Sequence, residues 1–236
     1  MLNETFYLEG VDALSVGIRL QKPIEFSSAV PIVETVSIPG RSGLLTLDTG
    51  AYENRAGRAS CFLLSQNAIN TVSSASNFLL STHGYRRLEC SNDQDHYWLA
   101  RVKNGARIED RLSVLNPFEI EFDCMPQKWL KSGETKVSVS NGGKLNNPYG
   151  GIASPLIIVY GNGYGKLNVG SYTVTINSMS NVLYLDSETE NAYNDNGNQN
   201  LNIYSVEFPK LIQGENNISF SGGITRIEII PRWWDK

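Results

Sequence analysis

Apolar and polar residues alternate along much of this chain, and one stretch departs from the pattern by carrying apolar residues at helical spacing. Residues 118–124 read Phe-Glu-Ile-Glu-Phe-Asp-Cys, the period of two that a half-buried strand requires. Residues 97–102 and 30–38 also have the composition of strands. Between about Gln66 and Thr82, apolar residues recur every three or four positions, which predicts an amphipathic helix. Gly84 is well placed to end this helix in a left-handed conformation.

The second half of the chain holds six short strand candidates, most of them separated by clusters of Gly, Asn, Ser or Pro. They are residues 137–139, 156–160, 172–176, 181–185, 217–220 and 226–230. So many short strands within about a hundred residues, with no helical pattern, predict an antiparallel β-sandwich or jelly roll. Six asparagines lie between Asn191 and Asn202, a composition that favours a mobile turn or a hairpin tip.

Composition divides the chain into two parts. Residues 1–130 carry nine of the eleven arginines and all three cysteines, whereas residues 131–236 are rich in Asn, Gly, Ser and Thr and poor in charge. A proline and a glycine bracket a possible linker at residues 125–133. We therefore expect a mainly β protein with an N-terminal domain over 1–130, containing the helix, and a C-terminal sandwich over 131–236.

Charge and cysteine content narrow the class of protein. The formal net charge is -4, from 20 basic and 24 acidic residues, which argues against non-specific nucleic-acid binding. The clustered arginines fit either a protein–protein contact or a solvated surface. Three cysteines without close pairing indicate free thiols in a reducing compartment. We expect synthesis in the cytoplasm, with no secretory signal and no membrane span.

Little in the sequence points to catalysis, and no cofactor or metal site is expected. The chain has two histidines, and the spacing of Cys90 and His96 matches no nucleophile motif. Zinc-binding spacings are absent from the sequence. Residues 161–165 read Gly-Asn-Gly-Tyr-Gly but lack the lysine of a phosphate-binding loop, so they predict a tight turn between two strands.

Three acidic residues alternate after one predicted strand: Asp186, Glu188 and Glu190. Residues two apart on a strand lie ~6.5–7 Å from each other, which is roughly the spacing of glycosidase carboxylates. A solvated strand edge is the favoured interpretation, because nothing else in the sequence supports hydrolysis. We expect that the protein is not an enzyme.

Aromatic residues offer a possible binding surface in the second half of the chain. They are Tyr164, Tyr172, Tyr184, Tyr193, Trp233 and Trp234. Aromatic faces of a β-sandwich bind carbohydrates by combining apolar and polar contacts. Trp233 and Trp234 are therefore candidates for a carbohydrate or partner contact, while packing in the core or at a subunit contact remains the favoured alternative.

Several segments occur in a characteristic order along nearly the whole chain. The first, residues 37–45, contains a Pro-Gly-Arg-Ser-Gly turn and precedes a Tyr-Glu-Asn-Arg segment. The others are residues 84–88 with 97–102, 122–133, 185–188 with Tyr193, 208–219, and 231–233. Together they resemble the distal tail protein of siphophages, particularly of phages and prophages that infect Gram-positive bacteria. That family usually has Asp where this chain has Ser42.

The resemblance implies a structural protein of the phage tail tip or baseplate. Family members form a hexameric ring, with an N-terminal domain like a split β-barrel carrying one helix and a C-terminal domain that is galectin-like. The ring joins the tail tube protein to the tail-associated fibre or lysin protein, and some members anchor receptor-binding proteins. The expected location is the virion, after assembly in the host cytoplasm. A carbohydrate-binding module that acts in host adsorption is the alternative.

The resemblance also gives candidate residues for the family turn and the ring interface. They are Pro39, Gly40, Arg41, Gly43, Tyr52 and Arg55.

Overall fold

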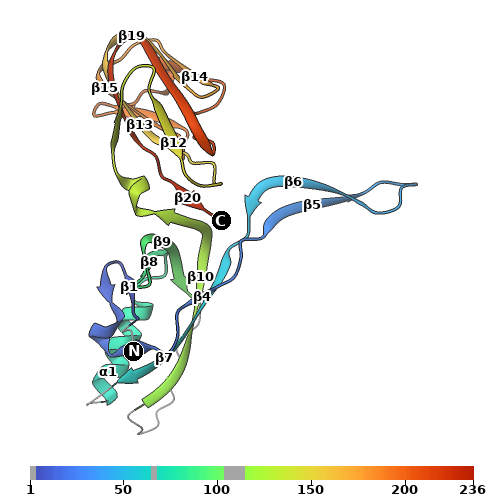
Figure 1. Ribbon diagram of the computed structural model, residues 1–236, viewed down its shortest axis with the longest axis vertical. Helices are drawn as coiled ribbons and strands as arrows, with labels where there is room; N and C mark the ends of the chain where they lie inside the picture. Colours follow the sequence, from blue (N-terminus) through green and yellow to red (C-terminus); the bar gives the residue numbers. More distant parts are fainter. Residues whose placement is uncertain (1–3, 65–67, 104–114) are drawn as a thin grey trace. The chain divides into compact units, whose positions relative to one another are not determined.

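The computed structural model describes residues 4–64, 68–103 and 115–236 (Figure 1). Its architecture is mainly β, and α1 is the one α-helix of these residues, so the predicted fold class is confirmed. The chain divides into two compact units: unit 1 spans Met1–Lys128 together with Lys236, and unit 2 spans Trp129–Asp235. Each unit has its own hydrophobic core.

Unit 1 contains two sheets and the helix. Its elements are β1 (Phe6–Leu8), β2 (Val11–Asp12), η1 (Ala13–Val16), β3 (Ile18–Leu20), β4 (Glu25–Phe26), β5 (Pro31–Ser37), β6 (Leu44–Tyr52), β7 (Arg55–Leu64), α1 (Ala68–Leu80), β8 (Arg86–Cys90), β9 (Asp93–Val102) and β10 (Leu115–Leu130), which ends in unit 2. The larger sheet has the order β2-β1-β8-β9-β10-β7-β3, and β4 also pairs with β7. Strands β5 and β6 form a separate two-stranded sheet.

The core of unit 1 follows from the alternation along its strands. On β10, Ile120, Phe122 and Cys124 are buried, as the period of two predicts. Phe122 meets Phe6 edge-on, with ring centroids 5.8 Å apart. Ala75 and Leu79 on one face of α1 join the same core, so the amphipathic pattern correctly located the helix, although residues 66 and 67 of the predicted range lie outside the described residues.

The end of α1 differs from the prediction. The helix ends at Leu80, and Gly84 does not have the positive φ of a left-handed cap. The guanidinium of the buried Arg86 instead donates hydrogen bonds to the carbonyl oxygens of Phe78, at 2.7 Å, and Leu79. These carbonyls have no partner inside the helix, so the side chain of Arg86, at the start of β8, caps the helix in place of Gly84.

Unit 2 is built on two long strands, β13 and β19. Its elements are η2 (Lys131–Glu134), β11 (Val137–Val139), β12 (Lys144–Asn147), β13 (Leu156–Val169), β14 (Tyr172–Ile176), β15 (Ser180–Asp186), β16 (Asn191–Asn194), β17 (Gly197–Asn198), η3 (Asn200–Asn202), β18 (Ile203–Tyr204), β19 (Gly214–Ile230) and β20 (Trp234–Asp235). The sheet order is β11-β19-β13-β15-β16-β17, with β12 also on β19 and β14 between β13 and β18.

Strands β13 and β19 each contribute to two parts of the sheet. Residues 156–162 of β13 pair with β15, whereas residues 165–169 pair with β14. β19 follows β13 along both parts, and the register shifts between Tyr160 and Gly165. Buried residues from both parts belong to one core. The sheet therefore folds over a single apolar interior at the place where the register shifts.

One prediction is wrong at this place: residues 161–165 were expected to form a turn but lie inside β13. The segments 217–220 and 226–230 are strand as predicted, but they belong to one continuous strand, β19. Glycine lets strands β13 and β19 approach closely. A Cβ on Gly223 would lie 1.7 Å from the Asn162 carbonyl oxygen, and a Cβ on Gly161 would lie 2.0 Å from the Gly223 carbonyl oxygen. These glycines therefore bend the strands without ending them.

The asparagine-rich segment between Asn191 and Asn202 was expected to form either a mobile turn or a hairpin tip, and it forms a hairpin tip. Strands β16 and β17 pair across it. The side chain of Asn194 accepts a hydrogen bond from the Asn196 N–H at 2.9 Å, and that of Asn200 accepts one from the Ala192 N–H at 2.5 Å. Amide side chains thus satisfy backbone donors of the turn.

We predict that Gly223→Ala lowers the free energy of unfolding by about 3 kcal/mol or more, because either β13 or β19 must move to admit the methyl group. Gly150→Ala is the matched control, since nothing lies within 4 Å of its added Cβ and its φ is not positive. Its effect should stay within about 0.5 kcal/mol. Urea unfolding of both variants measures the difference, and equal stabilities would contradict the close approach.

Candidate functional site

The β5–β6 hairpin is the most exposed apolar element of unit 1. It contains the Pro-Gly-Arg-Ser-Gly turn of residues 39–43. Glu34 pairs with Leu47 and Val36 with Leu45, so these four side chains share one face. Alternation along β5 adds Ile32 to this face. We call Ile32, Val36, Leu45 and Leu47 the hairpin apolar face. Each of these four residues is between 36% and 46% exposed.

The opposite face of the hairpin is more polar. Thr35 pairs with Thr46, Ser37 with Leu44, and Val33 with Asp48. In a globular protein, the apolar face of such an amphipathic ribbon packs on a core. Neither strand has a third strand beside it among the described residues (Figure 1). The hairpin apolar face is therefore left open to solvent.

The predicted site residues do not gather in one place. Pro39, Gly40, Arg41 and Gly43 form the turn between β5 and β6, where both glycines have positive φ. Tyr52 lies at the other end of the hairpin, opposite Pro31. Arg55 begins β7 and is buried, 6% exposed. The six predicted residues are therefore divided among three places: the exposed turn, the base of the hairpin and the interior of unit 1.

The sequence contained a signal for the hairpin apolar face that was interpreted only as a strand. Residues 30–38 have the composition of a strand, and the same composition describes a strand packed on a core. Exposure depends on whether another element covers the strand. Only the topology provides that information.

The side chains considered for nucleophilic chemistry are structural. Cys61, Cys90 and Cys124 are buried free thiols, and burial raises the pKa of each to about 12. A thiol with so high a pKa carries almost no thiolate at neutral pH. His96 Nδ1 lies 2.6 Å from an oxygen of Asp93 instead. No group of three His, Cys, Asp or Glu side chains suited to a metal ion occurs within the described ranges.

Of the three alternating acidic residues, Asp186 forms an ion pair with Arg232, whereas Glu188 and Glu190 are exposed. Arg232 donates to both oxygens of Asp186, at 2.6 and 3.2 Å, and its guanidinium also lies 3.1 Å from Glu188. Burial would raise the pKa of the Asp186 carboxyl, but the hydrogen bonds from Arg232 and the Glu188 N–H outweigh burial and lower that pKa. A bidentate arginine holds Asp186 in place, which is a structural role.

The two tryptophans also pack within unit 2. Trp233 is 6% exposed and belongs to the core. Trp234 is half-buried, and its indole N–H donates to the Ile152 carbonyl oxygen at 3.0 Å. The ring of Trp233 is thus not accessible for stacking on a ligand. Tyr184 and Tyr193 stack on each other across β15 and β16, with centroids 5.1 Å apart.

The structure resembles a solved phage protein over nearly its full length. The crystal structure of the SPP1 Dit (gp 19.1) protein, described as a paradigm of the hub adsorption apparatus in phages that infect Gram-positive bacteria, superimposes with a TM-score of 0.77. The match covers 96% of this chain and 97% of that chain at 12% sequence identity. At this identity the likeness establishes a shared fold.

Other comparisons add no closer assignment. No protein-family model and no curated protein matches the sequence. Among the residues that the structure describes, no helix has the length and apolarity needed to cross a membrane. The resemblance to distal tail proteins is therefore supported at the level of the fold.

We predict that Asp186→Asn lowers the free energy of unfolding by about 2 kcal/mol at pH 7, a value reduced for the partial exposure of Arg232. The folded pKa of Asp186 is lowered, so the stabilisation is present above the unfolded pKa of about 3.9 and is lost as pH falls through the folded pKa.

Urea unfolding at pH 7 and at pH 2 tests this pH dependence, with Glu188→Gln as control. Glu188 is more than half exposed, so its replacement should change the free energy of unfolding by about 0.5 kcal/mol or less. A deficit of Asp186→Asn that persists unchanged at pH 2 would contradict the ion-pair role.

Proposed function

We propose that this chain is a structural hub protein of a phage tail tip, and that identical copies assemble into a closed hexameric ring. The observation that carries the proposal is the open hairpin apolar face of unit 1. The fold likeness to a phage hub protein agrees with it. We propose no enzymatic activity and no cofactor for the chain.

The hairpin needs a covering surface, which a second copy can provide. A two-stranded hairpin alone is marginally stable in water. Burying its aliphatic side chains would stabilise it by about 25 cal/mol for each Å² of apolar surface removed from water. Every copy carries the same hairpin, so contacts made head to tail form a ring when the rotation between neighbours closes.

The two units have different parts in this proposal. Unit 1, corresponding to the predicted domain 1–130, forms the ring through its hairpin and contributes the turn residues Pro39, Gly40, Arg41 and Gly43 to the contact. Unit 2, corresponding to 131–236, is a galectin-like sandwich. The ring would join the tail tube protein to the tail-associated fibre or lysin protein and hold receptor-binding proteins, placing the chain in the virion after synthesis in the host cytoplasm.

We predict that the double substitution Val36→Lys with Leu45→Glu raises the concentration for half-assembly at least tenfold. These residues face each other across the hairpin, so the introduced charges can pair and preserve it. The same charges must be desolvated when a second copy covers the face. Light scattering after size-exclusion chromatography, over a range of concentrations, gives the mass relative to the 26.1 kDa chain.

The pair Thr35→Lys with Thr46→Glu is the matched control, because Thr35 and Thr46 also face each other but on the opposite side of the hairpin. This variant should assemble as the unchanged chain does. If both variants assemble equally well, or if only the control fails to assemble, the hairpin apolar face is not the contact.

We further predict that a fragment of residues 1–130 keeps the oligomeric state of the full chain. Both the hairpin and the core of unit 1 lie within it. Circular dichroism first establishes that the fragment is folded, and light scattering then gives its mass. The fragment 131–236 is the comparison and should remain a single chain. A folded 1–130 fragment that is monomeric would refute the division of roles.

A further inference from the structure

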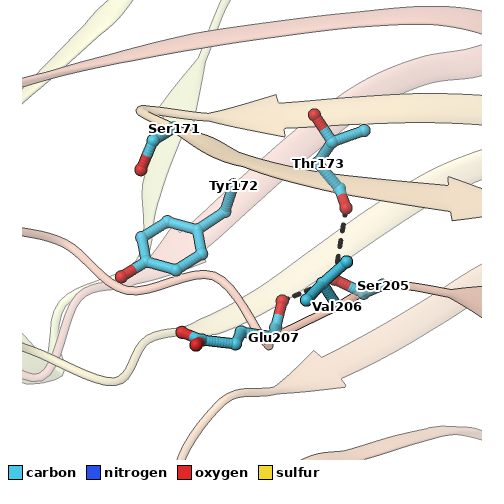
Figure 2. A pocket seen from close by; sticks show the side chains of 6 residues that line it. All are labelled: Ser171, Tyr172, Thr173, Ser205, Val206 and Glu207. Carbon is cyan, nitrogen blue, oxygen red and sulfur yellow. Dashed lines mark hydrogen bonds between the residues drawn. The ribbon is translucent and has the colours of Figure 1, made fainter.

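An interrupted strand pairing opens a cavity at one edge of unit 2. Strands β14 and β18 pair only at Thr175 with Tyr204 and at Ile176 with Ile203. Beyond Tyr204 the chain leaves the sheet. The hydroxyl oxygen of Ser205 then lies 3.1 Å from the Thr173 carbonyl oxygen and 2.5 Å from that of Glu207, which fixes the departing segment (Figure 2). The space between this segment and β14 remains open.

The cavity has a volume of about 410 Å³, within the range of small-molecule sites. Its lining residues are Ser171, Tyr172, Thr173, Ser205, Val206 and Glu207. The Tyr172 ring and the Glu207 carboxylate extend in the same direction from their backbones (Figure 2). Val206, at 88% exposed, adds an apolar surface. The lining thus combines one aromatic face with polar groups and a single charge.

Its polar side chains are available to a ligand. Thr173 uses its hydroxyl to bond Asn168 at 2.9 Å. By contrast, the side-chain oxygens of Ser171, Tyr172 and Glu207 make no hydrogen bond or ion pair within the described part of the chain. The Glu207 carboxylate can only accept hydrogen bonds, whereas the two hydroxyls can both donate and accept. A ligand with several hydroxyl groups matches these capacities.

We propose that this cavity binds a neutral saccharide. A pyranose ring has a face of C–H groups and an edge of hydroxyls. The Tyr172 ring covers that face, and Glu207 accepts from two adjacent hydroxyls while Ser171 completes the polar contacts. The negative charge of Glu207 disfavours phosphorylated or sulfated ligands. The assignment extends beyond the hub function, since a saccharide bound here would add recognition of a glycan surface to the structural role.

An extended peptide fits less well. Strand addition requires a row of unpaired backbone groups along an edge. Here the Ser205 hydroxyl lies within hydrogen-bond distance of the Thr173 carbonyl oxygen, and β14 begins only at Tyr172. The edge of β14 therefore offers few backbone groups to an added strand, whereas the side chains of Tyr172 and Glu207 remain available to a ligand.

Saturation-transfer difference NMR on the full chain tests the proposal. The probes are the methyl glycosides of galactose, glucose and N-acetylglucosamine, with glucose 1-phosphate as the anionic comparison. At least one neutral glycoside should bind with roughly millimolar affinity, the range expected for so small a ligand. Glucose 1-phosphate should bind more weakly than methyl glucoside.

Two pairs of variants locate the bound sugar. Tyr172→Ala and Glu207→Gln should each weaken binding about fivefold or more, through loss of the ring face or the charged acceptor. Tyr164→Ala and Glu190→Gln replace an exposed tyrosine and an exposed glutamate outside the cavity and should leave binding unchanged. Thermal unfolding verifies that all four variants are folded.

Three results would overturn the proposal: no signal from any neutral glycoside at 50 mM, stronger binding of glucose 1-phosphate, or equal binding by the cavity and control variants. None of these results depends on oligomeric mass. The saccharide site and the ring can therefore fail independently of each other.

Discussion

A β-strand presents every second side chain to the same face, and each apolar face must be covered by something other than water. This constraint accounts for both cores: β10 buries Ile120 and Phe122 in unit 1, while β13 and β19 enclose the interior of unit 2. The β5–β6 hairpin gathers Ile32, Val36, Leu45 and Leu47 on one face, yet among the described residues of its unit no third strand pairs with the hairpin, and these side chains are exposed. The proposed assembly arises from that unmet requirement.

Local patterns located most elements because they report properties of neighbouring residues. The alternation at 118–124 and the helical spacing near Ala75 identified β10 and α1. Prediction failed where a distant contact overrides a local preference. The glycines of 161–165 favour a turn locally, but Gly223 of β19 lies against them and β13 continues. A nearby contact also changed one helix end: the Arg86 side chain, rather than Gly84, caps α1.

The candidate sites, too, depend on contacts that a local sequence pattern does not report. The sequence identified the turn at 39–43, which lies at the exposed hairpin tip. It did not indicate that Asp186 pairs with Arg232, 46 positions away, or that Trp233 is in the core. Tyr172 was among the aromatic candidates, but nothing in the sequence indicated that Glu207 lines the same cavity, because the chain leaves the sheet after Tyr204. Each of these relationships depends on tertiary contacts.

In the proposed assembly, copies of this chain dock side by side through the hairpin and close into a ring. Images of purified full-length particles test it most directly, recorded alone at high concentration and again with the tail proteins added. We expect closed rings with sixfold symmetry, in which each β5–β6 hairpin is covered by a neighbouring copy. Single subunits under both conditions, or rings in which the hairpins stay uncovered, would contradict it.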